Sequence, residues 1–265
     1  MSHHDLTDDQ WNAIRDFFPA KFSRRPGRPW ADHRRIVSAI LWILLTGSPW
    51  RSLPAEFGSW QTAYNRFQRW IDNDLWDEVY AALLHQADAC GHVDRSLWCV
   101  DGTVIRAHRC ASGMLPQSVE NDEMNALGRS RGGYSMKLHV LTDANGLLMS
   151  WTASPGQRHE SQELKRLLAN SLFPVDWIGH RPQAIAGDKG YGSAEIREHI
   201  ARKRIQVVIP RKSNEAPAED FNPKTYRRRN IVERAIGWLK VSRRVFVRYD
   251  KLTSSYLAFV QLAAM

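Results

Sequence analysis

Three acidic residues, far apart in the chain, occupy positions where a carboxylate could do chemistry. Asp101 lies inside the apolar stretch 97–105, where a charge is costly unless it binds something. Asp188 follows a second strand-like stretch, and ligand sites in open α/β sheets gather at the carboxyl ends of strands. Glu233 belongs to the stretch 226–240. Carboxylate oxygens suit hard divalent cations such as Mg²⁺, so these three side chains could converge on two metal ions for phosphodiester transfer.

The stretch 226–240 has the spacing of a single helix. Tyr226, Glu233 and Lys240 then share one stripe, with Arg229 one turn before Glu233. An apolar stripe beside it would dock on a core, and it consists of Val232, Ala235, Ile236 and Leu239. A lone carboxylate among cations suits a metal ion, with Arg229 and Lys240 holding a phosphate chain. The alternative is an ordinary solvated, charged helix face.

Each of these residues also has a structural interpretation. An aspartate at a strand end, such as Asp188, commonly caps a turn or a helix. Asp143 and Glu160 are rival ligands by position, although Asp143 lies in an expected hairpin turn. The sequence has no HxxxH spacing, which disfavours a zinc site. Three histidines could be ligands, bases or structural side chains: His108, His139 and His159.

The composition favours a polyanionic partner. The 265 residues include 37 Lys and Arg against 28 Asp and Glu, which gives a formal charge of +9 and a pI near 9.7. Basic residues cluster at 21–29, 32–35, 128–133 and 227–229, as on a surface that follows phosphates. A hydrophobic content of 43% with 11 Trp excludes global disorder.

Cysteine usage and hydropathy exclude two further classes of protein. Three Cys without a CxxC pair, and with no signal peptide ahead of them, predict reduced thiols in the cytoplasm. They argue against a disulfide framework. The longest apolar run, 36–45, is too short to span a bilayer, so we expect a buried helix and no membrane partner.

The first part of the chain, 1–92, has the pattern of an all-helical domain. Helices are expected at about 7–18, 32–45, 59–71 and 75–89, the first with Thr7 and Gln10 as a capping box. In the third helix, the aromatic side chains share one face, and Arg66 and Arg69 lie outside that face together with Asn and Gln side chains. This favours a helix-turn-helix that reads DNA, and an ordinary three-helix bundle remains the alternative.

The second part, 93–265, alternates strands and helices. Asn145-Gly146 between two strand-like runs predicts a hairpin. A mixed α/β sheet flanked by helices is expected. Strands are expected at 96–107, 137–144, 147–154, 183–187 and 205–210, and helices at 161–171, 193–203 and 226–240.

The motifs together resemble the DDE-type transposases of bacterial insertion sequences, in the IS-five group of the IS-four superfamily. The last helix matches that superfamily's signature of Tyr, Arg, Glu and Lys at Tyr226, Arg229, Glu233 and Lys240. VDGTVIRAH at 100–108 and GDKGYGS at 187–193 resemble the segments that carry its two aspartates. The resemblance extends over nearly the whole chain, although the family's chains usually run past residue 265.

The resemblance implies a ribonuclease H-like catalytic core behind a helical DNA-binding domain. It implies Asp101, Asp188 and Glu233 as catalytic and metal-binding residues, with two Mg²⁺ or Mn²⁺ ions. Double-stranded DNA, as transposon ends and target, would be the partner of a homodimer at the bacterial nucleoid. A nuclease without strand joining and a silent, DNA-binding regulator are the alternatives. The residues expected to contact DNA are Tyr226, Arg229, Lys240, Arg66, Arg69, Arg129 and Arg131.

Overall fold

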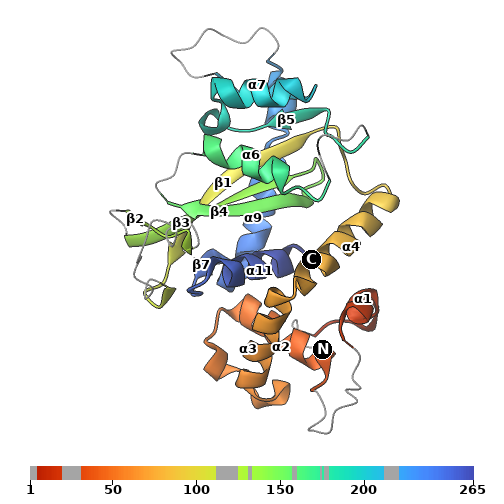
Figure 1. Ribbon diagram of the computed structural model, residues 1–265, viewed down its shortest axis with the longest axis vertical. Coiled ribbons are helices and arrows are strands. Elements are labelled where there is room, and N and C mark those ends of the chain that lie inside the picture. The colour runs from red at the N-terminus through yellow and green to blue at the C-terminus, as the bar shows by residue number, and fades with distance from the viewer. Residues whose placement is uncertain are drawn as a thin grey trace.

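The protein has a helical region at one end and a sheet flanked by helices at the other, as the computed structural model shows (Figure 1). The structure describes residues 5–19, 31–111, 125–130, 133–156, 160–173, 175, 179–211 and 221–265, without the side chains of residues 129, 130 and 161. None of the helices within these ranges is long and apolar enough to cross a membrane.

The helical region begins as the capping signals predict. In α1 (Asp8–Ile14) the Thr7 and Gln10 side chains and backbones form the reciprocal capping box. A 3-10 turn, Arg15–Phe17, follows. The N-cap of α2 (His33–Thr46) is Asp32, and the helix ends at Gly47, whose φ of 67° suits glycine. The remaining helices are α3 (Trp60–Asp72) and α4 (Leu75–Ala89).

The connection between α2 and α3 has the length that the expected helix bounds leave between them. Residues 47–59 contain two 3-10 turns, Trp50–Ser52 and Ala55–Phe57, whereas a helix-turn-helix joins its helices by about 3–4 residues. The connection therefore lacks the tight turn of the helix-turn-helix motif. Pro49 and Pro54 start the two turns, because each fixes its own φ and cannot extend a helix.

The sheet has the strand order of a ribonuclease H-like core. Its five main strands run β4-β3-β1-β5-β6, with β3 antiparallel to both neighbours and β1, β5 and β6 parallel. The strands are β1 (Trp98–Ala107), β3 (Gly133–Thr142), β4 (Leu148–Pro155), β5 (Ala184–Ala186) and β6 (Gln206–Val208). Two short strands, β2 (Gly128–Ser130) and β7 (Val247–Arg248), extend the edges of β3 and β1.

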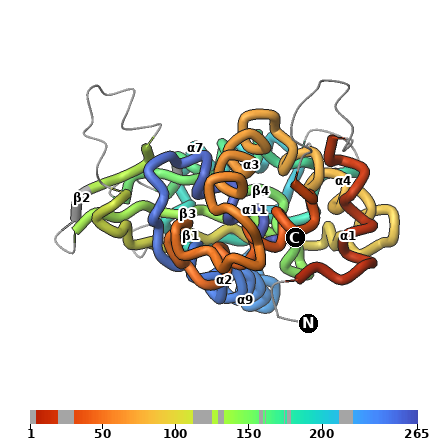
Figure 2. The backbone as a smooth tube through the Cα atoms, turned by 90° about the horizontal axis from the view of Figure 1, so that it is seen from below, coloured from red at the N-terminus to blue at the C-terminus, as the bar shows by residue number. Residues whose placement is uncertain are grey.

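Helices cover both faces of this sheet. One face carries α6 (Ser161–Ala169) and α7 (Ala194–Arg202), and the other carries α9 (Asn230–Val241). Figure 2 shows α7 and α9 on opposite sides of the sheet. The apolar stripe of α9 is buried as predicted. The stretch 226–240 is nevertheless not one helix, because α8 (Pro223–Arg227) ends before α9 begins. A 3-10-type bond from Arg229 N–H to the Tyr226 carbonyl joins the two.

The end of the chain packs against the helical region. After α10 (Arg243–Phe246), helix α11 (Thr253–Ala264) contacts α2, α3 and α4. Phe259 of α11 stacks on Phe67 of α3 with ring centroids 4.6 Å apart. The helical region and the sheet therefore share one continuous apolar core.

Candidate active site

The strand pairing of β1 and β5 brings Asp101 and Asp188 to the same level. Cys99 pairs with Ala186 in a parallel ladder, and each aspartate lies two residues beyond its member of that pair. Asp188 therefore directly follows the carboxyl end of β5, beside the middle of β1. The strand-end rule thus accounts for the position of Asp188, whereas Asp101 lies inside its strand as expected.

Asp188 is held by the turn that follows it. Its Oδ1 accepts the N–H of Gly190 at 2.9 Å, so the carboxylate also caps the 3-10 turn Lys189–Tyr191. A Cβ on Gly190 would overlap Oε2 of Glu160 and lie 3.0 Å from Oδ1 of Asp188. Only glycine leaves room for both carboxylates at this point, because they approach the backbone so closely.

Arg229 joins the other two predicted carboxylates. Its guanidinium forms an ion pair with Oδ2 of Asp101 at 3.2 Å and contacts Oε1 of Glu233 on the same helix. The side chains of Arg229 and Asp101 are 16% and 19% exposed, whereas that of Glu233 is 51% exposed. Asp101 on β1 and Glu233 on α9 thus share one arginine, and Asp188, just past β5, lies at the level of Asp101.

Burial and charge oppose each other at Asp101. Burial raises the pKa of Asp101, the nearby cation of Arg229 opposes the rise, and the negative charge of Asp188 adds to it. The same negative charges gather around Tyr191, whose pKa is raised by burial and by Glu160, Asp101 and Asp188. Such crowding of negative charge is typical of sites that bind cations.

The remaining signature residues surround this group. Lys240 donates a 2.6 Å hydrogen bond from Nζ to Oγ1 of Thr103 on β1, and burial lowers its pKa. Tyr226 packs on Phe221, and the guanidinium of Arg229 lies 5.9 Å from the centre of the Tyr226 ring. The break between α8 and α9 therefore leaves Tyr226 in contact with Arg229.

The rival ligands have structural roles. Asp143 is fully buried and accepts N–H groups of Asp94, Asn145 and Leu147 at 2.8–2.9 Å, which fixes the hairpin turn. His139 is buried between the hydroxyls of Tyr191 and Ser154, each 2.9 Å away. The exposed His108 packs on the Tyr249 ring, and His159 lies outside the described residues.

Glu160 is the rival that lies at the site. Lys137 of β3 binds its Oε1 at 3.0 Å, and its other oxygen faces Gly190. Sequence reasoning missed this Lys137–Glu160 pair and Tyr191. The only signal in the sequence is that Tyr191 belongs to the glycine-rich segment that also contains Asp188.

The carboxylates fit a divalent cation by chemistry, since Asp101, Asp188 and Glu233 all offer hard oxygen donors. Within the described parts of the chain, no group of three or more His, Cys, Asp or Glu side chains is close enough to hold a metal ion. Arg229 supplies the positive charge between Asp101 and Glu233 instead.

The predicted DNA contacts differ in their surroundings. Arg69 is exposed on α3, but the expectation that Arg66 points outward is wrong. Arg66 is buried, lies 3.2 Å from the His33 ring nitrogen Nδ1, and has its guanidinium 5.7 Å from the centre of the Trp70 ring. Arg129 belongs to β2 without a described side chain, and Arg131 lies outside the described residues.

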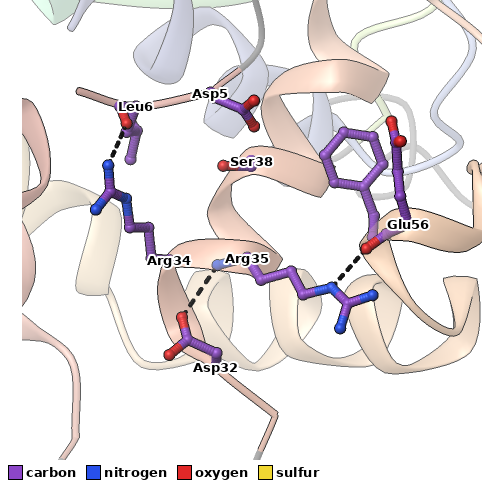
Figure 3. A pocket seen from close by; sticks show the side chains of 8 residues that line it. Asp5, Leu6, Asp32, Arg34, Arg35, Ser38 and Glu56 are labelled. Atoms are coloured by element: carbon purple, nitrogen blue, oxygen red, sulfur yellow. Dashed lines mark hydrogen bonds between the residues drawn. The ribbon is translucent and has the colours of Figure 1, made fainter. Parts of the chain in front are cut away.

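The basic cluster at 32–35 also stabilises the fold. Arg34 donates to the Leu6 carbonyl at 2.6 Å, and Arg35 donates to the Glu56 carbonyl at 2.6 Å (Figure 3). Both line a cavity of about 670 Å³ whose rim also includes Asp5. This cavity contains none of the predicted catalytic or DNA-binding residues.

Comparisons with known proteins agree with the motifs. The family model described as the transposase DDE domain matches residues 93–265, and a model of IS4/5-family transposases matches residues 6–80. The uncharacterized protein y4sN of Sinorhizobium fredii is 35% identical over 113 residues, which cover 43% of this chain and 85% of that protein.

A further relative and one solved structure are less similar. The transposase of insertion sequence element IS1106 of Neisseria meningitidis serogroup B is 26% identical over 200 residues, 66% of each chain. The solved catalytic domain of Mos1 mariner transposase is 11% identical, with a TM-score of 0.30 over 75% of this chain and 89% of that one. The DDE domain model matches more than half of this chain, so the chain belongs to the DDE transposase family and is a DNA transposase.

Proposed function

We propose that Asp101, Asp188 and Glu233 are the catalytic carboxylates with which this transposase cuts and joins DNA. The observation that carries the proposal is the double contact of Arg229, which holds Asp101 and Glu233 together beside the strand end that bears Asp188. Loss of any one carboxylate would leave the other two unable to complete the site.

The DDE transposase domain uses divalent metal ions. We assign two Mg²⁺ or Mn²⁺ ions to the three carboxylates, because oxygen donors suit these cations. When bound, such ions activate the attacking water or hydroxyl and stabilise the leaving oxygen. Arg229 neutralises Asp101 and Glu233 in the structure, and its guanidinium would suit a DNA phosphate if the ions took over those carboxylates.

We further propose that residues 1–92 grip DNA and residues 93–265 carry out the chemistry. The partners are the terminal inverted repeats, the target DNA and a second copy of the chain, because two ends must be joined. Tyr226, Arg229 and Lys240 contact phosphates near the cut, and Arg69, Arg129 and Arg131 contact the flanking duplex. Arg66 is left out because it is buried. The DNA substrate would place the enzyme at the nucleoid.

The test is cleavage of DNA that carries the inverted repeats flanking the gene, with Mg²⁺ or Mn²⁺. Asp101→Asn, Asp188→Asn and Glu233→Gln should each reduce cleavage about 10³-fold or more and leave end binding in place. Glu198→Gln is the matched control, because Glu198 also pairs with an arginine in i,i+4 spacing but lies on α7. Normal cleavage by any of the three variants would exclude its residue from the site.

A second reaction separates a transposase from a nuclease. A pre-cut end that carries a 3′-hydroxyl should be joined to target DNA by the wild-type chain and not by Asp101→Asn. Cleavage without joining would identify a nuclease. End binding without either reaction would identify a DNA-binding regulator.

A further inference from the structure

A cavity of about 690 Å³ lies where the helical region meets the far end of β1. Trp50, Trp60 and Tyr64 of the helical region line it. His108, directly after β1, and Tyr249, directly after β7, line it as well. Five aromatic rings from two parts of the chain thus line one cavity, and none of the predicted catalytic residues is among its described lining.

The rings are fixed in place by the core behind them. The Trp50 ring lies 5.6 Å from Phe67 and 6.2 Å from Phe259, both fully buried. The His108 and Tyr249 rings lie 5.3 Å apart. Tyr64 remains 38% exposed at the mouth. The cavity is therefore a preformed aromatic slot, and its volume is that of a typical small-ligand site.

Arg51 supplies the positive charge of the cavity, because the other arginine that lines it, Arg244, is paired with an aspartate. The guanidinium of Arg51, an exposed residue, lies 5.6 Å from the centre of the Trp60 ring. Arg244 is buried, pairs with Asp250 at 2.8 Å and lies 5.4 Å from the centre of the Tyr249 ring, so it positions that ring. Flat aromatic faces with a cation at the rim suit a nucleobase and its phosphate.

We propose that this cavity binds one unstacked nucleobase of the DNA, with Arg51 on the adjacent phosphate. The inference rests on the proposed function, because it takes the DNA end as the ligand. Six residues of β1 separate Asp101 from Ala107, which is about 20 Å of strand. The base would therefore lie several nucleotides from the cut, and the cavity would hold the DNA in register without contacting the reacting atoms.

The test compares two strands of equal length and charge on the full chain. One is a single-stranded oligothymidine of about 12 nucleotides, and the other is the same backbone without bases. The wild type should bind the oligothymidine about tenfold more tightly, the effect of stacking a base on an aromatic ring. Binding of the abasic strand reports phosphate contacts alone, so it tests the DNA binding of the proposed function separately.

The variants remove one ring at a time. Trp60→Ala and Tyr64→Ala should each lose most of the preference for the oligothymidine and keep the affinity for the abasic strand, which also shows that they are folded. Tyr64→Phe keeps a ring and should keep the preference. Trp238→Ala is the matched control, because Trp238 is 77% exposed on α9 and outside the cavity.

A chemical readout locates the bound base. Cys110 lines the cavity. Cys90, at the C-terminal end of α4, is exposed as well and does not line the cavity. Bound oligothymidine should slow alkylation of Cys110 and leave Cys90 unchanged. The inference is overturned if the wild type binds both strands equally, or if Trp60→Ala and Tyr64→Ala keep the preference for the oligothymidine. Either result leaves the proposed DNA binding intact. No binding of either strand overturns the inference together with the proposed DNA binding.

Discussion

Arg229→Ala should destabilise the ion-free protein mainly through Asp101. At 3.2 Å and an effective dielectric constant of about 20, the Asp101–Arg229 attraction is about 5 kcal/mol before the cost of burying both groups is subtracted. We expect a net loss of about 2–3 kcal/mol in the free energy of unfolding at pH 7, since both side chains are mostly buried. The half-exposed Glu233 adds only about 0.5 kcal/mol or less.

The loss should depend on pH. Burial already raises the pKa of Asp101 in the folded protein, and removal of Arg229 raises it further. When the pKa of a carboxyl is higher in the folded than in the unfolded chain, its protonation stabilises the fold. This stabilisation is complete below the unfolded-state pKa of about 4, and it is lost as the pH rises through the folded-state pKa. The deficit of Arg229→Ala relative to the wild type should therefore shrink as the pH falls from 7 toward about 4.

Urea unfolding of a double-mutant cycle measures the coupling directly. In an Asp101→Asn background, Arg229→Ala should cost less than about 1 kcal/mol, because no buried charge is left unpaired. The coupling energy should be about 2 kcal/mol. The same cost in both backgrounds, or a deficit that does not change with pH, would refute the assignment of Arg229 to Asp101.

Two further predictions concern stability, each with a matched control and measured by urea unfolding. Gly102→Ala should lower the free energy of unfolding by about 1–3 kcal/mol, because the new Cβ would lie 2.9 Å from the Tyr191 hydroxyl. Gly237→Ala, in open space on α9, should instead raise the free energy of unfolding by up to about 1 kcal/mol. Thr7→Ala should lower the free energy of unfolding by about 1 kcal/mol, because the side chain of Thr7 caps α1. Ser59→Ala should lower it less, because the side chain of Ser59 does not cap α3. The reverse order within either pair would contradict the contacts described for it.

Local signals predicted much of the fold. The Thr7 capping box, the Gly47 helix end and the Asn145-Gly146 turn each depend on neighbouring residues, so the sequence alone specifies them. The position of Asp188 just past a buried strand was predictable from the local pattern, as was that of Asp101 inside another strand. Their catalytic role stays a prediction.

Other features depend on residues far away in the chain. Arg66 is buried because it meets His33, 33 positions earlier, and no local pattern reports that contact. The break before α9 lets Arg229 reach both Asp101 and Glu233, and helical periodicity predicts only the second contact. The aromatic cavity combines rings from the helical region with rings near β7, so it becomes visible only in the folded chain.

The central claim is that Asp101, Asp188 and Glu233 together hold divalent cations on the DNA-bound enzyme. Electron paramagnetic resonance of Mn²⁺, titrated into the full chain with its terminal-repeat DNA, measures the bound ions themselves and not the reaction product. The account predicts two bound ions for the wild type and Glu198→Gln, and loss of tight Mn²⁺ binding in Asp101→Asn and in Asp188→Asn. Unchanged Mn²⁺ binding in both aspartate variants would contradict it.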